Sequence, residues 1–156
     1  MKILLVNPPV GFGYYSMGLS RPPLGLAYIA SHLTTNHRVE IEDFNINRKS
    51  WKRFPFGGYD VVGVSADAAR YATSLKIARR AKAAGATVVM GGPHVSFFDE
   101  DALESGAVDY VIRNEGELSF LSLIKHLSHE IPLEDVKGLS YMSGGRLMRT
   151  LDAPFI

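Results

Sequence analysis

Small and polar residues stand directly after the apolar runs of this 156-residue sequence, where they could contact a ligand. Ser65 ends one such run, and Gly91 and Gly92 end another. Paired glycines let a bulky group approach the backbone, because no Cβ stands in the way. A serine offers a hydroxyl that both donates and accepts a hydrogen bond. These residue types indicate either a binding site or a simple turn at Gly91-Gly92 with Ser65 capping the next helix.

The histidines are the other candidate functional residues, because a histidine side chain can ligate a metal or carry a proton. His94 follows the glycine pair, and the sequence leaves open whether it hydrogen bonds to a ligand or to its own turn. His126 and His129 lie three apart near an expected helix end. Without a third ligand in view, we interpret them as a solvated helix terminus rather than a metal site. We predict no catalytic residue and no metal ligand in this chain.

Two further motifs are weaker. Gly11-Phe12-Gly13 is similar to part of a dinucleotide-binding fingerprint, but a serine stands at position 16. The next helix begins only near Pro23, too late for its N-terminus to face a pyrophosphate, so we reject that reading. Asp67 either caps a helix expected from Ala69 or places a carboxylate beside the candidate site, and capping is favoured.

Composition excludes several classes of function. The sequence has no cysteine, which excludes disulfides, thiolate zinc sites, a thiol nucleophile and an iron–sulfur cluster held by this chain. Its formal net charge of +1 argues against a nucleic-acid-binding surface. No apolar stretch approaches the roughly 20 residues that a membrane-spanning helix needs. We expect a soluble, cytoplasmic chain that binds neither nucleic acid nor membranes.

The elements that must position these residues alternate regularly along the chain. Short apolar runs predict strands at residues 3–6, 39–41, 61–65, 87–90 and 108–112. Helical patterns predict helices at about 23–33 and 69–84 and a third that ends before Pro132, and residues 45–58 are expected to be irregular. The apolar stripe of the third helix is Phe120, Leu123, Ile124 and Leu127. This alternation predicts an α/β fold: a flavodoxin-like (Rossmann-type), doubly wound sheet of five parallel strands in the order 2-1-3-4-5. Ligands of such sheets bind beyond the carboxyl ends of the strands.

The C-terminal residues follow a different pattern. Residues 137–142 and 146–150 flank Ser143-Gly144-Gly145, which predicts a β-hairpin. The last six residues are mostly apolar, so we expect the sequence to be a piece of a longer protein. We place the α/β domain at residues 1–132, and the hairpin and the start of a linker at 133–156.

Five phrases, taken together, carry a family resemblance. They are KILLVNPP at 2–9, RPPLGLAY at 21–28, YDVVGVS at 59–65, VVMGGPH at 88–94 and VDYVIRNEGE at 108–117. In order and spacing they resemble the N-terminal cobalamin (B12)-binding domain that precedes the catalytic barrel of many radical-SAM enzymes. The resemblance implies that this chain holds cobalamin and presents it to that barrel. A 4Fe-4S cluster and S-adenosylmethionine would belong to the barrel alone.

The resemblance also implies roles for residues at the strand ends. The nucleotide tail of cobalamin would enter beside Gly91 and Gly92, with Ser65 hydrogen bonding near its base. The cofactor-binding residues so implied are Asn7, Pro8, Ser65, Ala66, Gly91, Gly92, Pro93, His94, Glu115 and Gly116. The chain alone would not be catalytic, and the parent protein would be a methyltransferase or a cyclase. The alternative is a degenerate scaffold that keeps the fold, binds no corrinoid and only orients the barrel.

Two departures from related patterns lead to expectations of their own. Cobalamin mutases and methionine synthase carry Asp-x-His-x-x-Gly after strand 1, and the histidine ligates cobalt. This sequence has no histidine from Asn7 to Tyr28, which implies a base-off cofactor without a histidine ligand from this domain. Asn114 stands where the family usually has glycine; asparagine tolerates a left-handed backbone, so we expect the turn to survive.

Overall fold

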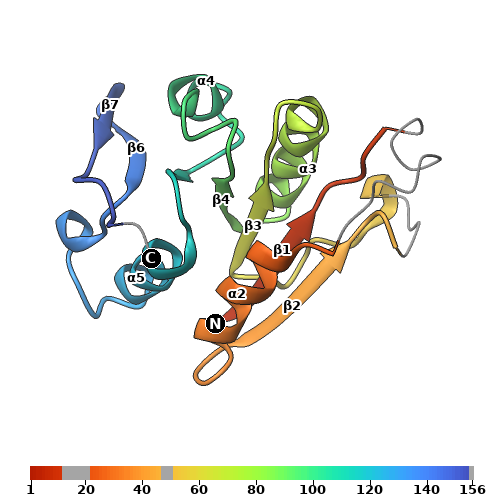
Figure 1. Ribbon diagram of the computed structural model, residues 1–156, viewed down its shortest axis with the longest axis horizontal. Helices are drawn as coiled ribbons and strands as arrows, with labels where there is room; N and C mark the ends of the chain where they lie inside the picture. Colours follow the sequence, from red (N-terminus) through yellow and green to blue (C-terminus); the bar gives the residue numbers. More distant parts are fainter. Residues whose placement is uncertain (12–21, 47–50, 155–156) are drawn as a thin grey trace.

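The computed structural model describes residues 1–11, 22–46 and 51–154, and in these ranges it forms one seven-stranded sheet between helices (Figure 1). The strands are β1 (Lys2–Asn7), β2 (Arg38–Asp43), β3 (Val61–Ser65), β4 (Thr87–Gly91), β5 (Tyr110–Ile112), β6 (Leu139–Ser143) and β7 (Arg146–Arg149). The helices are α2 (Leu24–Leu33), α3 (Tyr71–Ala83), α4 (Asp99–Glu104) and α5 (Glu117–Leu127), with 3-10 turns at Trp51–Arg53 and Leu133–Asp135. The spatial order is β2-β1-β3-β4-β5-β6-β7.

This order confirms the predicted parallel sheet. Strands β2, β1, β3, β4 and β5 pair in parallel, and the predicted hairpin β6–β7 continues the same sheet in antiparallel fashion beyond β5. The sheet has one hydrophobic core on each of its faces. Successive residues of a strand point to opposite faces, so β1 contributes to both cores. Leu4 and Val6 pack with α3 and α4, whereas Ile3 and Leu5 pack with α2 and α5. Burial on both faces explains why β1 is apolar without a break.

Helix positions agree with the sequence patterns apart from two details. Helix α3 begins at Tyr71 rather than Ala69, because a turn capped by Asp67 precedes it. The six-residue α4 was not predicted, since it is too short to show a helical period. In the segment predicted to be irregular, the described residues contain one 3-10 turn. In the described ranges no helix combines the length and the apolar character needed to cross a bilayer.

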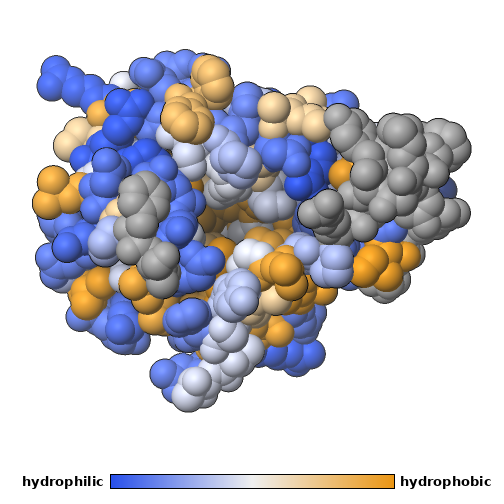
Figure 2. Space-filling model, in the orientation of Figure 1, coloured by the Kyte–Doolittle hydropathy of each residue, from blue (hydrophilic) through white to orange (hydrophobic). Residues whose placement is uncertain are grey.

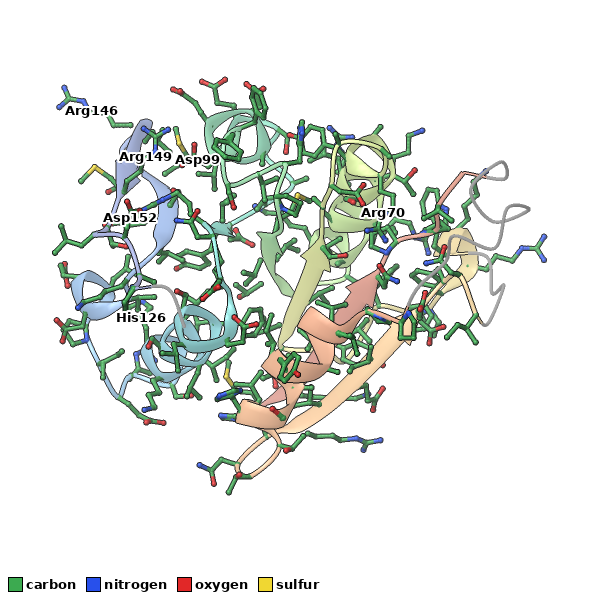
Figure 3. All side chains as sticks on the ribbon, in the orientation of Figure 1. Arg70, Asp99, His126, Arg146, Arg149 and Asp152 are labelled. Atoms are coloured by element: carbon green, nitrogen blue, oxygen red, sulfur yellow. The ribbon has the colours of Figure 1, made fainter. Side chains whose placement is uncertain are left out.

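A network of charges, buried at Asp99 and Arg113, attaches the hairpin to the sheet. Arg113, only 7% exposed, donates from Nη1 to the Leu139 carbonyl oxygen and to Ser140 Oγ, both at 2.7 Å. Ser140 Oγ in turn donates to Asp99 Oδ2 at 2.5 Å. Arg149 on β7 closes the network with two hydrogen bonds of 2.8 Å to the Asp99 carboxylate. Figure 3 shows Arg149 and Asp99 side by side, while Arg146 points away from them.

This network should make hairpin stability depend on pH. The hydrogen bonds of Arg149 lower the pKa of Asp99 to about 2, although burial opposes them. A carboxyl group with a depressed folded-state pKa stabilises the fold above its unfolded pKa and loses that contribution as the pH falls toward 2. We expect Asp99→Asn to lower the free energy of unfolding by about 2 kcal/mol at pH 7, with the difference disappearing near pH 2.

Urea unfolding at pH 7, 4 and 2 measures this difference. Asp101→Asn is the matched control, because Asp101 lies on the same helix and is exposed. Equal stability of the Asp99→Asn and Asp101→Asn proteins at pH 7 would contradict a stabilising role for the network.

Candidate functional site

A cavity of about 320 Å³ opens at the carboxyl edge of the parallel sheet. Its floor comes from β1, β3, β4 and β5, and its walls come from α2 and from the start of α5. Figure 2 shows this face hollowed near its centre, with apolar residues inside the hollow. The lining combines apolar side chains, above all Leu5, Leu26, Ile29, Val89 and Phe120, with a few polar groups. An apolar cavity with few polar groups at this edge is typical of a cofactor site.

The structure brings six of the ten predicted site residues into the wall of this cavity. They are Asn7, Ser65, Gly91, Gly92, Glu115 and Gly116. The other four, Pro8, Ala66, Pro93 and His94, lie within two residues of wall residues in the chain but are not part of the lining. The predicted residues thus divide into six that line the cavity and four that do not.

The two glycines at the end of β4 serve different purposes. Gly92 has a φ of 122°, and a Cβ on it would lie 2.5 Å from the Ala66 carbonyl oxygen. The turn therefore requires glycine at this position whether or not a ligand is present. Gly91 has no such constraint: its nearest neighbour for a Cβ is the Ile112 carbonyl oxygen at 3.7 Å, an ordinary contact. At Gly91, the missing side chain leaves space in the cavity.

Two oxygen atoms in the cavity wall are buried without a hydrogen-bond partner. They are Ser65 Oγ at the end of β3 and Glu117 Oε2 at the start of α5. Ser65 therefore does not cap the following helix, which was the alternative to a binding role. A buried polar atom without a partner is costly unless a ligand or water satisfies it. Together with the open space beside Gly91, these atoms make the cavity suited to a bulky ligand that is mainly apolar and carries polar groups.

An arginine that the sequence analysis did not single out also lines the cavity. Arg70 forms an ion pair of 2.5 Å with Asp67 and donates from Nη1 to Asn7 Oδ1 at 2.6 Å. Figure 3 shows Arg70 near the end of β1. Burial alone raises the pKa of Asp67, but the hydrogen bonds and charge of Arg70 outweigh it and leave the pKa below its ordinary value. The Asp67 carboxylate also accepts the Arg70 backbone N–H at 2.9 Å, so it closes the turn that precedes α3, whereas the N-cap of the helix itself is Arg70, without a side-chain capping bond.

The loop after β1 is fixed by a second polar cluster. Asn45 Oδ1 accepts the Val10 N–H at 2.7 Å, and Asn45 Nδ2 donates to the Pro8 carbonyl oxygen at 3.2 Å. Asn45 is held in place by Asp43, because Asn45 Nδ2 also donates a hydrogen bond of 2.8 Å to Asp43 Oδ1. Pro8 thus anchors the start of the loop. Residues 12–21, including most of Gly11-Phe12-Gly13, lie outside the described ranges.

His94 packs in an aromatic cluster and is not part of the cavity lining. Its ring lies 4.3 Å from the ring of Tyr71 and 4.9 Å from that of Phe98, measured between centroids. Its backbone N–H donates to the Ala66 carbonyl oxygen at 3.3 Å. Burial raises the pKa of Tyr71, whose hydroxyl has no hydrogen-bond partner. Of the two roles considered for His94, these contacts favour stabilisation of its turn.

Asn114 and the helix-end histidines behave as their residue types suggest. Asn114 has a φ of 60°, which confirms that asparagine supports the left-handed turn where the family usually has glycine. Its N–H donates to Ser96 Oγ at 2.8 Å. His126 Nδ1 lies 3.1 Å from the Ile131 carbonyl oxygen, and His129 has a φ of 61°. The described ranges contain no cluster of three side chains able to hold a metal ion.

Sequence reasoning missed three kinds of wall residue. Arg70 could have been found from its spacing of three residues from Asp67, which suits an ion pair across one turn. Leu26 and Ile29 lie in the helix predicted at about 23–33, where the helical period marks them only as apolar positions. Glu117 is the last residue of the VDYVIRNEGE phrase, but nothing in the sequence shows that its carboxylate turns into the cavity.

Comparisons with known sequences match this chain to one protein family and to two longer methyltransferases. The model of the family described as "B12 binding domain" matches residues 16–124. An uncharacterized methyltransferase of Pyrococcus horikoshii is 38% identical, and the match covers 100% of this chain and 36% of that protein. The cytidylyl-2-hydroxyethylphosphonate methyltransferase of Streptomyces wedmorensis is 28% identical, over 90% of this chain and 31% of its own length. The chain thus spans about a third of the length of these relatives.

Comparisons with solved structures support the fold. The radical S-adenosylmethionine methyltransferase TsrM from Kitasatospora setae, solved with cobalamin and a 4Fe-4S cluster, matches with a TM-score of 0.79 and 20% identity. That match covers 100% of this chain and 30% of TsrM. The cobalamin-dependent radical enzyme OxsB matches with a TM-score of 0.77 and 20% identity, over 99% of this chain and 22% of OxsB. At this level of identity the two structures show that the chain shares their fold.

Proposed function

Because the chain belongs to the B12-binding domain family, we propose that it binds cobalamin at the carboxyl edge of its sheet, with the nucleotide tail in the cavity. The observation that carries the proposal is the cavity itself. It lies at the edge where such sheets bind ligands, Gly91 leaves it open, and Ser65 Oγ lacks a partner within it. An apolar cavity of this size suits the flat base of a nucleotide tail.

The residues of the chain would share the work of holding the cofactor. Ser65 would hydrogen bond to the base, Gly91 would give the base room, and Arg70 would keep Asn7 in position through its hydrogen bond. Gly92, Ala66, Pro93 and His94 would maintain the turn after β4, and Pro8 would hold the loop after β1. Glu115 and Gly116 would form the wall beside α5. When bound, cobalamin supplies a cobalt centre able to carry and transfer a methyl group.

We further propose that the cofactor is base-off and receives no histidine ligand from this domain. All five histidines of the sequence lie in the described ranges, and none of them lines the cavity. The nearest in the chain to the wall, His94, is held between Tyr71 and Phe98. A tail buried in the cavity would place its base away from cobalt.

The physiological partner in this proposal is a radical-SAM barrel in the same polypeptide. Residues 1–132 would be the cofactor domain, and residues 133–156 would be the hairpin and the start of the connection to the barrel. The curated relatives, about three times as long as this chain, include methyltransferases and an anaerobic magnesium-protoporphyrin IX monomethyl ester cyclase. The parent protein would then be a methyltransferase or a cyclase, with its 4Fe-4S cluster and S-adenosylmethionine in the barrel. Methyl transfer is the reaction that we favour.

Incubation of the chain with hydroxocobalamin, followed by desalting and a visible absorption spectrum, tests the proposal. We expect a corrinoid to elute with the protein and to show a base-off spectrum. Retained corrinoid with an imidazole nitrogen on cobalt would overturn the proposed ligation but not the binding. A colourless protein would overturn cobalamin binding and favour the alternative of a scaffold that only orients the barrel.

A further inference from the structure

Glu117 is the one acidic residue of the cavity wall with an oxygen atom that is buried and unpaired within the described ranges. Its position as the first residue of α5 explains part of its presence, because acidic residues in a first helical turn interact favourably with the helix dipole. That interaction is equally available to a carboxylate in solvent, so it does not account for the burial of Oε2 in the cavity.

Among the wall residues that the structure describes, no cation compensates this carboxylate. Arg70 is the basic residue among the described wall residues, and its guanidinium is already bound to Asp67, to Asn7 and to the Pro8 carbonyl oxygen. A buried carboxylate oxygen accepts hydrogen bonds only, so it requires a donor. That donor has to come from whatever fills the cavity.

The two unpaired oxygens of the wall differ in what they can offer a ligand. Ser65 can donate to a nitrogen of an aromatic base, whereas the Glu117 carboxylate accepts from a hydroxyl or an N–H group. The rest of the wall includes Leu26, Ile29 and Phe120, which suit a flat apolar ring. A ligand that presents a base nitrogen, an apolar ring and a hydroxyl would satisfy all three.

We propose that Glu117 accepts a hydrogen bond from a ribose hydroxyl of the cobalamin nucleotide, and so selects a complete nucleotide tail over a corrinoid that lacks one. This inference rests on the proposed function and adds a specificity-determining residue to its site. Ser65 would hydrogen bond to the base, and Glu117 would hydrogen bond to the sugar. Hydrogen bonds to charged groups are the strong ones, so their loss has a measurable cost.

The test compares hydroxocobalamin with cobinamide, a corrinoid without the nucleotide, in equilibrium binding to the wild-type chain and to Glu117→Ala. We expect Glu117→Ala to weaken cobalamin binding about tenfold and to leave cobinamide binding unchanged. Glu104→Gln, which removes an exposed acidic charge from α4, is the control and should change neither. Urea unfolding of the ligand-free variants shows whether each chain is folded.

A second measurement removes the corrin from the comparison. Free α-ribazole, the ribonucleoside of the tail, and free 5,6-dimethylbenzimidazole are used to displace bound cobalamin. We expect the nucleoside to compete better than the base in the wild type, and this advantage to disappear in Glu117→Ala. In Ser65→Ala both competitors should weaken together.

The outcomes separate this inference from the proposed function. If wild type binds cobalamin and Glu117→Ala binds it equally well, the role of Glu117 is overturned while the proposed function stands. Equal weakening of cobalamin and cobinamide by Glu117→Ala would show a structural role and would also overturn the inference. Failure of the wild type to bind cobalamin would overturn both.

Discussion

Gly91→Phe should abolish retention of cobalamin while the domain stays folded. A Cβ at Gly91 meets only the Ile112 carbonyl oxygen and Cβ, at 3.7 and 3.9 Å, so the strand accepts a side chain there. A phenyl ring would then occupy the space that we assign to the nucleotide base. Excluding an aromatic group from an apolar cavity costs about 3 kcal/mol or more, which is at least a hundredfold in affinity.

The measurement is the amount of hydroxocobalamin that elutes with each protein after desalting. Gly57→Phe is the matched control, because Gly57 is exposed, has no atom within 4 Å of a Cβ and lies outside the cavity. A Gly91→Phe protein that is folded and retains the corrinoid as the wild type does would remove the tail from this cavity.

The neighbouring residue should respond differently: Gly92→Ala should destabilise the fold itself. Its φ of 122° is a conformation that residues with a side chain rarely adopt, and the new Cβ would lie 2.5 Å from a backbone oxygen of Ala66. Neither the turn nor the Ala66 backbone can move freely, since Ala66 donates its N–H to the Gly91 carbonyl oxygen at 2.8 Å. We expect the free energy of unfolding to fall by about 3 kcal/mol.

Gly85→Ala separates the two causes of this loss of stability, which are backbone strain and the contact with Ala66. Gly85 also has a positive φ, 93°, but no atom lies within 4 Å of its Cβ position. It should therefore lose only about 1 kcal/mol, from backbone strain alone. Urea unfolding of both variants in the absence of ligand makes the comparison, and equal losses would show that the contact with Ala66 is not limiting.

Gly91 and Gly92 therefore have separate roles, although they stand side by side as one motif in the sequence. From the sequence alone, the pair Gly91-Gly92 could form either a turn or part of a ligand site. In the structure, the turn depends on Gly92 and the open cavity on Gly91. A variant at Gly92 is therefore a poor probe of binding, because loss of the cofactor would follow from loss of the fold.

Much of the architecture was predictable because its signals are local. Apolar runs such as 61–65 and helical periods such as that of α5 are set by neighbouring residues, and their alternation restricts the sheet to few topologies. The order of the parallel strands then places Asn7, Ser65 and Gly91 at one edge. Asn114 was predictable for the same reason, since its left-handed backbone depends on its own side chain.

By itself, then, the sequence determined the fold, the edge of the sheet that carries the candidate site and the family of the domain. Only the tertiary structure decided which side chains face the cavity. Ser65 and Glu117 are 52 residues apart in the sequence, and packing of α5 against the sheet brings both into one wall. His94 follows the wall residues Gly91 and Gly92 in the chain, but its ring packs against the rings of Tyr71 and Phe98. Such choices depend on contacts between distant segments, and local residue patterns do not encode them.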